Sequence, residues 1–151
     1  MESHTTILFQ FFEAARTNNP KRVQRLLDSG ISVNARDDCN GSTALHFACL
    51  KGARQVIEVL VKNGADVNVR NDRGVTPLYY LAQSRYEVMA IYLIHQGARL
   101  DIADVQSFSV LDVTPQFMQQ ELIEAADIYQ KSCRNAMRRT YNSSRNMVAG
   151  A

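Results

Sequence analysis

The stretch Gly41-Ser-Thr-Ala-Leu-His-Phe-Ala-Cys-Leu-Lys-Gly52 decides the fold, because its residue types return at a fixed interval. Three kinds of residue keep a spacing of 33 or 34 positions. They are the hydroxyl residues Thr43, Thr76 and Ser109, the leucines Leu45, Leu78 and Leu111, and the glycines Gly30, Gly64 and Gly97. Self-similarity at such an interval is the signature of stacked structural repeats. A period held across most of the chain therefore predicts a modular fold.

Each period carries the residues of two short helices. Thr43 precedes an apolar segment and can cap its free backbone N–H groups, and Gly52 can end that helix in a left-handed conformation. A second segment ends at Gly64 and has apolar residues at helical spacing, namely Val56, Ile57, Leu60 and Val61. Neither helix has an apolar face wide enough to be stable alone, so neighbouring helix pairs must stack to bury a common core.

Residues Asp38–Arg70 resemble the ankyrin repeat, whose pattern is D-x-x-G-x-T-P-L-H-x-A-A followed by G, I/V-V-x-x-L-L and G-A-D-V-N. The next copy keeps Gly74, Thr76, Pro77, Leu78, Ala82, Leu93, Gly97 and Ala98. The resemblance implies an all-α solenoid in which each repeat is a β-turn, or finger, plus a helix–turn–helix. We expect an ankyrin repeat domain at residues 1–113, with repeats at about 5–37, 38–70 and 71–103 and a partial copy at 104–113.

The histidine and thiols of these repeats predict structure rather than chemistry. The resemblance implies that His46 bonds to backbone and to the Thr43 hydroxyl, and Cys49 occupies a core alanine position. A metal or catalytic role for His46 would need partners, but His4 and His95 fall elsewhere in the pattern. The sequence has no GxSxG, phosphate loop, HExxH or paired Cys/His spacing. We predict no enzymatic activity, no catalytic or metal residues, no cofactor and no small-molecule substrate.

The third repeat departs from the pattern on its helices. Tyr79 replaces the usual histidine, and Tyr80, Tyr86 and Tyr92 add further aromatic side chains. Two interpretations stay open: the tyrosines set binding specificity, or they fill space that smaller residues leave. Arg85 replaces the glycine that ends the first helix, which puts in doubt the tight turn at that point.

The fourth copy breaks off at Pro115, which cannot sit inside a regular helix. Thr114 and Pro115 predict the start of a long amphipathic helix at 114–139, followed by a flexible tail at 140–151. The apolar positions of this helix are Met118, Leu122, Ala125, Ala126, Tyr129, Cys133 and Met137. It has two interpretations, a C-terminal lid over the last hydrophobic layer or a helix for docking and self-association.

The charge of the sequence only weakly indicates what kind of partner the protein binds. The formal net charge of +2 is too small to argue for nucleic acid, but residues 128–151 lack Asp and Glu and hold five cations. These are Lys131, Arg134, Arg138, Arg139 and Arg145. Such cations complement a helix dipole, and the alternative is a basic patch for acidic protein, RNA or membrane phosphate.

Three cysteines without a pairing pattern and the absence of a membrane-length apolar stretch favour the cytoplasm. The nucleus, or a host cytosol for an exported protein, is the alternative location.

The resemblance implies that a partner protein binds the finger tips and the first helix of each pair. Carried onto this sequence, those positions are Arg36, Asn40, Ser42, Leu50, Lys51, Arg70, Asp72, Arg73, Val75, Gln83, Ser84, Val105 and Phe108. Leu50, Val75, Val105 and Phe108 are apolar where the fold expects solvent, although the C-terminal helix is an alternative cover for Val105 and Phe108. The predicted function is an adaptor, scaffold or inhibitor. The alternatives are a secreted bacterial effector or a protein that self-associates through its C-terminal helix.

Some ankyrin proteins are also substrates of asparagine hydroxylases. Asn34 and Asn68 stand in the corresponding setting here, so a bracing role and hydroxylation are both open for them.

Overall fold

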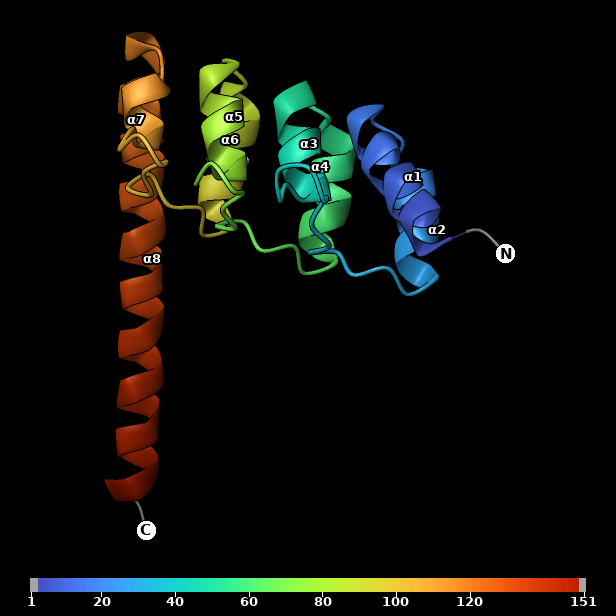
Figure 1. Ribbon diagram of the computed structural model, residues 1–151. Coiled ribbons are helices and arrows are strands. Elements are labelled where there is room, and N and C mark those ends of the chain that lie inside the picture. The colour runs from blue at the N-terminus through green and yellow to red at the C-terminus, as the bar shows by residue number, and fades with distance from the viewer. Residues whose placement is uncertain (1–2, 150–151) are drawn as a thin grey trace.

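The computed structural model describes residues 3–149, which form a row of stacked helix pairs (Figure 1). The helices are α1 (His4–Arg16), α2 (Pro20–Asp28), α3 (Ala44–Lys51), α4 (Arg54–Lys62), α5 (Pro77–Gln83), α6 (Glu87–His95), α7 (Val110–Val113) and α8 (Gln116–Ala149). One row of contacts joins α1, α3, α5 and α7, and on the other side α2 packs against α4 and α6 packs against α8. The described residues otherwise contain one isolated antiparallel bridge, between Arg36 and Thr43. The all-α solenoid is confirmed.

The core runs without interruption between the two rows. Its fully buried large side chains include Phe11, Leu45, Ile57, Leu60, Leu78, Leu93 and Leu122. Burying one leucine contributes about 1.5–3 kcal/mol, so each interface between repeats rests on a few such residues. Phe11 and Val23 of the first copy belong to this core, which confirms that copy as part of the stack.

The repeated hydroxyl residues are the N-caps of the first helices. Thr43 forms a capping box with His46, and the Thr76 side chain accepts from the Tyr79 N–H. Ser109 caps α7, where Asp112 takes the place of the histidine and accepts from the Ser109 N–H at 2.7 Å. The 33-residue period is therefore a period of helix starts.

The tight turn between α5 and α6 is kept although Arg85 stands in place of glycine. Gly52 ends α3 with φ 64°, and Arg85 holds the same left-handed conformation with φ 65°. The Tyr86 N–H bonds to the Leu81 carbonyl at 2.9 Å, as the Ala53 N–H bonds to that of Ala48 at 2.8 Å. The doubt about this turn is removed, because packing on both sides imposes a backbone conformation that arginine alone disfavours.

The fourth copy completes the stack in a shortened form. Pro115 ends α7 after four residues, and α8 then packs against α6 in the position of a second helix. Met118, Leu122 and Ala125 of α8 are buried. This first part of α8 is thus the lid over the last hydrophobic layer.

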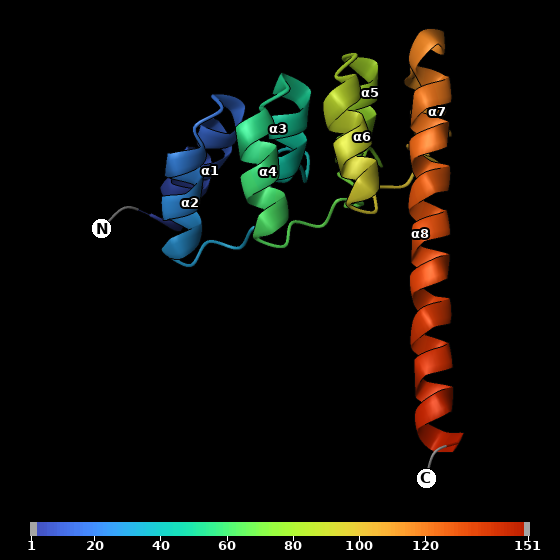
Figure 2. The same ribbon diagram turned by 180° about the vertical axis from the view of Figure 1, so that it is seen from behind.

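The remainder of α8 leaves the stack and projects beyond it (Figures 1 and 2). The sequence predicts an end near Arg139 and a tail at 140–151, but the structure continues the helix to Ala149. The reason is the absence of a stop signal: Gln130 stands 33 residues after Gly97, and no Gly or Pro occurs from there to Gly150. Residues 1, 2, 150 and 151, which the predicted first domain and tail include, lie outside the described part of the chain. No helix of residues 3–149 is both long and apolar enough to cross a bilayer.

Candidate functional site

Three finger loops, at residues 37–42, 71–75 and 104–108, share one internal design. A side-chain oxygen at the start of each loop accepts a backbone N–H at its end. Asp37 accepts from Ser42 at 2.7 Å, Asn71 from Val75 at 3.1 Å, and Asp104 from Phe108 at 3.0 Å. Each finger is therefore stabilised by a side-chain hydrogen bond within its own loop, in addition to its contacts with the neighbouring finger.

Backbone and arginine contacts join the fingers into one row. The Asp72 N–H bonds to the Asn40 carbonyl at 2.9 Å, and the Val105 N–H bonds to the Arg73 carbonyl at 3.0 Å. The Arg36 guanidinium donates to the Arg70 carbonyl at 2.9 Å and pairs with the Asp72 carboxylate at 3.1 Å.

Arg70 repeats the arrangement by donating to the Ala103 carbonyl at 2.8 Å. Arg36 and Arg70 were expected to contact a partner, yet their guanidinium groups hold the fingers together. The 34-residue spacing of these two arginines was the signal for this role.

Two of the predicted surface residues are buried, so the expectation that they face a partner is wrong. The Ser42 side chain is 2% exposed, and its hydroxyl accepts from the Asn71 amide at 3.2 Å. Val75 is also 2% exposed, and its carbonyl accepts from Nε2 of His46 at 2.9 Å. Both positions lie at the base of a finger, where each contacts a neighbouring repeat.

Four exposed residues of the predicted surface gather at the second and third fingers. Asp72 and Arg73 are exposed on the second finger. Val105 is 69% exposed and Phe108 49% exposed on the third, so neither is covered by α8. An arginine beside an exposed valine and phenylalanine is a composition typical of interface centres.

The remaining predicted residues lie apart from these tips. Asn40 is half-buried between the first two fingers. Leu50 and Lys51 are exposed at the end of α3, and Gln83 is exposed and Ser84 half-buried at the end of α5. An eight-residue helix such as α3 is about 12 Å long, so these positions stand one helix length from the finger bases.

His46 is a structural bridge between repeats, as the resemblance implied. Its Nδ1 accepts from the Thr43 N–H at 3.0 Å, while Nε2 donates to the Val75 carbonyl of the next finger. Burial lowers the pKa of His46, which favours the neutral ring that these two bonds require. Cys49 is fully buried, and burial raises the pKa of its thiol well above the usual value, so the thiolate is suppressed.

The tyrosines of the third repeat take over the histidine's bridging role. The Tyr79 hydroxyl donates to the Asp104 carboxylate of the next finger at 3.4 Å. Its ring packs edge-on against Tyr80, which in turn packs edge-on against His46. Burial and the Asp104 carboxylate raise the pKa of Tyr79. Since Tyr79 and Tyr80 connect repeats, their position supports the space-filling interpretation over binding specificity.

Asn34 and Asn68 brace the linkers between repeats. The Asn34 side chain accepts from the Asp66 N–H at 2.8 Å, and the Asn68 side chain accepts from the Arg99 N–H at 2.9 Å. Asn68 also donates to the Gly97 carbonyl at 3.0 Å. The bracing role has direct contacts, and hydroxylation of either residue stays a prediction.

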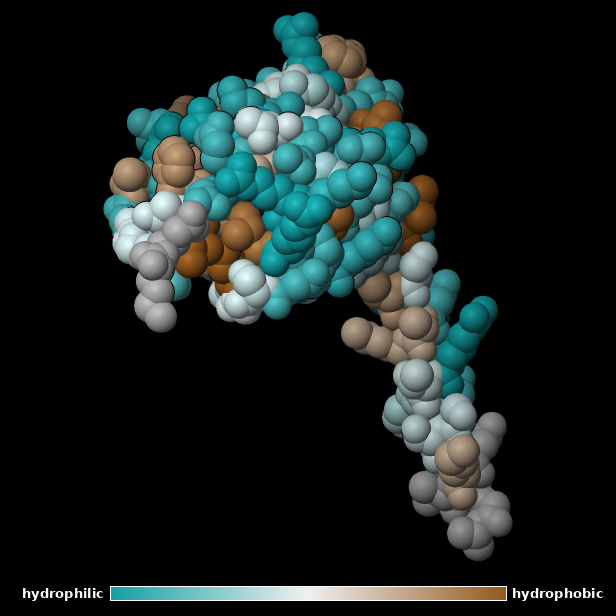
Figure 3. Space-filling model, turned by 90° about the vertical axis from the view of Figure 1, so that its right-hand side faces the viewer, coloured by the Kyte–Doolittle hydropathy of each residue, from teal (hydrophilic) through white to brown (hydrophobic). Residues whose placement is uncertain are grey.

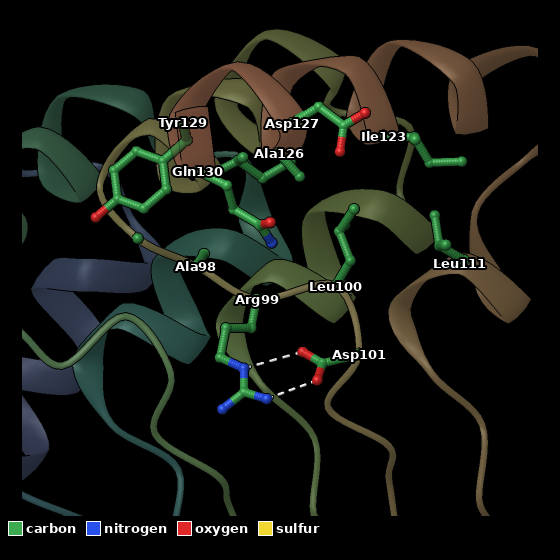
Figure 4. A pocket seen from close by; sticks show the side chains of 12 residues that line it. Ala98, Arg99, Leu100, Asp101, Leu111, Ile123, Ala126, Asp127, Tyr129 and Gln130 are labelled. Carbon is green, nitrogen blue, oxygen red and sulfur yellow. Dashed lines mark hydrogen bonds and ion pairs between the residues drawn. The ribbon is translucent and has the colours of Figure 1, made fainter. Parts of the chain in front are cut away.

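A groove of about 760 Å³ lies where the third repeat meets α8. Figure 4 shows Ile123, Ala126 and Asp127 of α8 above Leu100, with an ion pair between Arg99 and Asp101 at the rim. The guanidinium hydrogen bond lowers the pKa of the Asp101 carboxyl. The groove is mainly apolar and has no cluster of titratable groups that points to catalysis. Within residues 3–149, no three His, Cys, Asp or Glu side chains are grouped to hold a metal ion.

Comparison with known proteins agrees with this architecture. A family model described as ankyrin repeats (3 copies) matches residues 11–104. The chain is an ankyrin repeat protein. Ankyrin repeats are protein-interaction modules and as a family generally lack enzymatic activity of their own.

Relatives of this ankyrin repeat protein share only part of their length with it. It is 35% identical over 100 residues to the ADP-ribosylation factor GTPase-activating protein AGD2 of Arabidopsis thaliana, a match covering 66% of this chain and 12% of the relative. It is 38% identical over 79 residues to ankyrin repeat domain-containing protein 40 of Homo sapiens, covering 52% and 21%. The match to protein phosphatase 1 regulatory subunit 27 of Mus musculus is 42% identical over 65 residues, covering 43% and 42%. The matched region is thus less than half of each of these relatives.

Proposed function

We propose that this protein is an adaptor, scaffold or inhibitor that binds another protein through the tips of its second and third fingers. The observation that carries the proposal is the pair of exposed apolar side chains, Val105 and Phe108, on a finger that backbone bonds hold in place. A surface that is already ordered before binding loses little conformational entropy on association, which favours affinity.

The revised binding surface is smaller than the sequence predicted. It comprises Asp72, Arg73, Val105 and Phe108, with Leu50, Lys51 and Gln83 as a second, separate set. Arg36 and Arg70 are exposed but hold the fingers together through their guanidinium groups, and the buried Ser42 and Val75 are not part of the surface. One relative is by name a regulatory subunit of a phosphatase, which favours regulation of an enzyme over enzymatic activity in this chain.

We further propose that the protein acts in the cytoplasm. All three cysteines, Cys39, Cys49 and Cys133, are free thiols, as expected in a reducing compartment.

The experiment is affinity capture with the full chain, identification of the partner by mass spectrometry, and titration of the purified partner against variants. Val105→Ser combined with Phe108→Ala should weaken binding by about thirtyfold, since loss of a central interface residue typically costs 2 kcal/mol or more. Val88→Ser is the matched control, because Val88 is also 69% exposed but lies on α6, in the second-helix row. Unchanged affinity of the double variant, or an equal loss in the control, would place the binding surface elsewhere.

A further inference from the structure

The outer face of α8 carries a regular row of exposed side chains. They follow one another at spacings of three, four and seven residues, which place them on one face of a helix. The row consists of Gln120, Glu124, Asp127, Lys131, Arg134, Arg138 and Arg145, all exposed. Met118, Leu122 and Ala125 point the other way and are buried against the stack. The row therefore faces away from the protein's own core.

The sign of charge along this row changes once, near the middle of the helix. Residues 100–130 contain six acidic residues and no Lys or Arg, whereas residues 128–151 contain five cations and no Asp or Glu. On the outer face the change falls between Asp127 and Lys131. One helix thus presents an acidic half, which lies on the stack, and a basic half, which projects from it.

Within residues 3–149 these charges lack ion-pair partners. None of the four ion pairs found among residues 3–149 involves α8. Every side chain from Arg134 to Arg145 is exposed, and the basic half extends from the body as a narrow arm (Figure 3). Helices in proteins draw most of their stability from packing rather than from intrinsic helix propensity. Packing against another surface would therefore stabilise the projecting half of α8.

We propose that the occupant of this face is a second copy of the chain, with the two α8 helices packed antiparallel. In that arrangement the basic half of each helix lies along the acidic half of the other. A pairing of Asp127 with Arg134 has its midpoint at residue 130.5, and a pairing of Glu124 with Arg138 has its midpoint at 131. The two pairs therefore fit a single two-fold axis, which passes beside Lys131, and the two Lys131 ammonium groups meet there as the one like-charge contact of the row. A parallel arrangement would instead place like charges together.

An exposed aromatic ring fits the same register, and a groove adjoins the same face. Phe117 is 62% exposed, and a midpoint of 131 sets its ring opposite the partner's Arg145. A guanidinium over an aromatic ring is a favourable contact. Ile123 and Asp127 also line the groove of about 760 Å³ beside this face, which offers room for the partner's side chains (Figure 4).

The overlap is large enough for a stable contact. Residues 117–145 of both helices overlap over about 43 Å at 1.5 Å per residue. A two-fold arrangement uses the same patch on both copies and closes on itself. Each stack extends away from the joint on its own side, so the finger surface stays free for another partner.

An anionic membrane is the main competing occupant for the basic half. The side away from the cations, however, mixes the small or polar Ala136 and Thr140 with the large apolar Met137, Tyr141 and Met147. Helices that lie in a bilayer surface bury a continuous face of large apolar side chains, which this half presents only in part. The acidic half would also be repelled from such a surface.

The test is a charge swap read by sedimentation velocity and light scattering. The wild-type chain should move from 17.0 kDa toward twice that mass as its concentration rises at low salt. The association should weaken at high salt, because screening shortens the range of exposed charge pairs. Arg134→Glu/Arg138→Glu and Glu124→Arg/Asp127→Arg should each raise the dimer dissociation constant at least tenfold. An equal mixture of the two variants should dimerise again, since positions 124, 127, 134 and 138 are then all acidic in one helix and all basic in the other.

The control is Lys21→Glu/Arg25→Glu on α2, which changes net charge equally at exposed positions away from α8. It should dimerise like the wild type, and circular dichroism should show helical content retained in every variant. The proposal is overturned by a wild-type chain that stays at 17.0 kDa, or by a mixture that fails to associate. A monomer that cosediments with vesicles of equal phosphatidylcholine and phosphatidylserine would overturn it in favour of a membrane surface.

Discussion

Replacing Arg85 with glycine should stabilise the protein. Arg85 sits at φ 65°, a left-handed conformation that costs a residue with a β-carbon about 1–2 kcal/mol. Glycine removes that cost, but its greater conformational freedom in the unfolded chain lowers the unfolding free energy by about 0.5–1 kcal/mol. The net gain in unfolding free energy is therefore about 0.5–1 kcal/mol. The Arg85 side chain is exposed and takes part in none of the ion pairs among residues 3–149, so its loss subtracts little.

The assay is urea denaturation followed by far-ultraviolet circular dichroism, because the chain lacks tryptophan. With a denaturant slope of about 2 kcal/mol/M, Arg85→Gly should raise the midpoint by about 0.3–0.5 M. Arg85→Ala is the control, since it removes the same side chain but keeps the β-carbon and its strain. If Arg85→Gly is no more stable than Arg85→Ala, the turn does not impose the strain that its backbone angle implies.

Three further substitutions test contacts between repeats. Gly52→Ala should lower the unfolding free energy by about 2–4 kcal/mol in thermal or urea unfolding, because Gly52 has φ 64° and an added β-carbon would lie 2.5 Å from the Tyr86 ring. Combining it with Tyr86→Ala, which removes that ring, should recover part of the loss. The unfolding free energy of the wild type should fall as pH drops below about 6.5, because burial lowers the pKa of His46 in the folded state and the unfolded state therefore takes up the proton first. His46→Gln should lose this part of the pH dependence, and an unchanged slope of unfolding free energy against pH between 7.5 and 5.5 in that variant would contradict the assignment. Asn68→Ala should cost about 1–2 kcal/mol in urea unfolding and more than Asn34→Ala, because the Asn68 side chain makes two hydrogen bonds to the next linker and the Asn34 side chain makes one. Equal losses would count against the bracing role.

Local chemistry explains why the repeat could be read from the sequence. A hydroxyl residue before an apolar segment and a glycine after it act within one turn of helix, so their spacing alone places the helices. Thr43, Thr76 and Ser109 therefore predicted the helix starts, and the resemblance then predicted the bridging role of His46. The mainly apolar faces of these short helices required stacking, which predicted the solenoid.

Contacts between neighbouring repeats decided what the sequence left open. Val75 looks like an exposed apolar residue in the sequence but is buried in the stack, and Arg36 looks like a binding residue but donates hydrogen bonds to the adjacent finger. Arg85 keeps a turn that its own preference opposes, because packing outweighs about 1 kcal/mol of local strain. Residue types within a repeat determined the fold of this protein, whereas only the tertiary structure determined its available surface, since exposure depends on which repeat lies alongside.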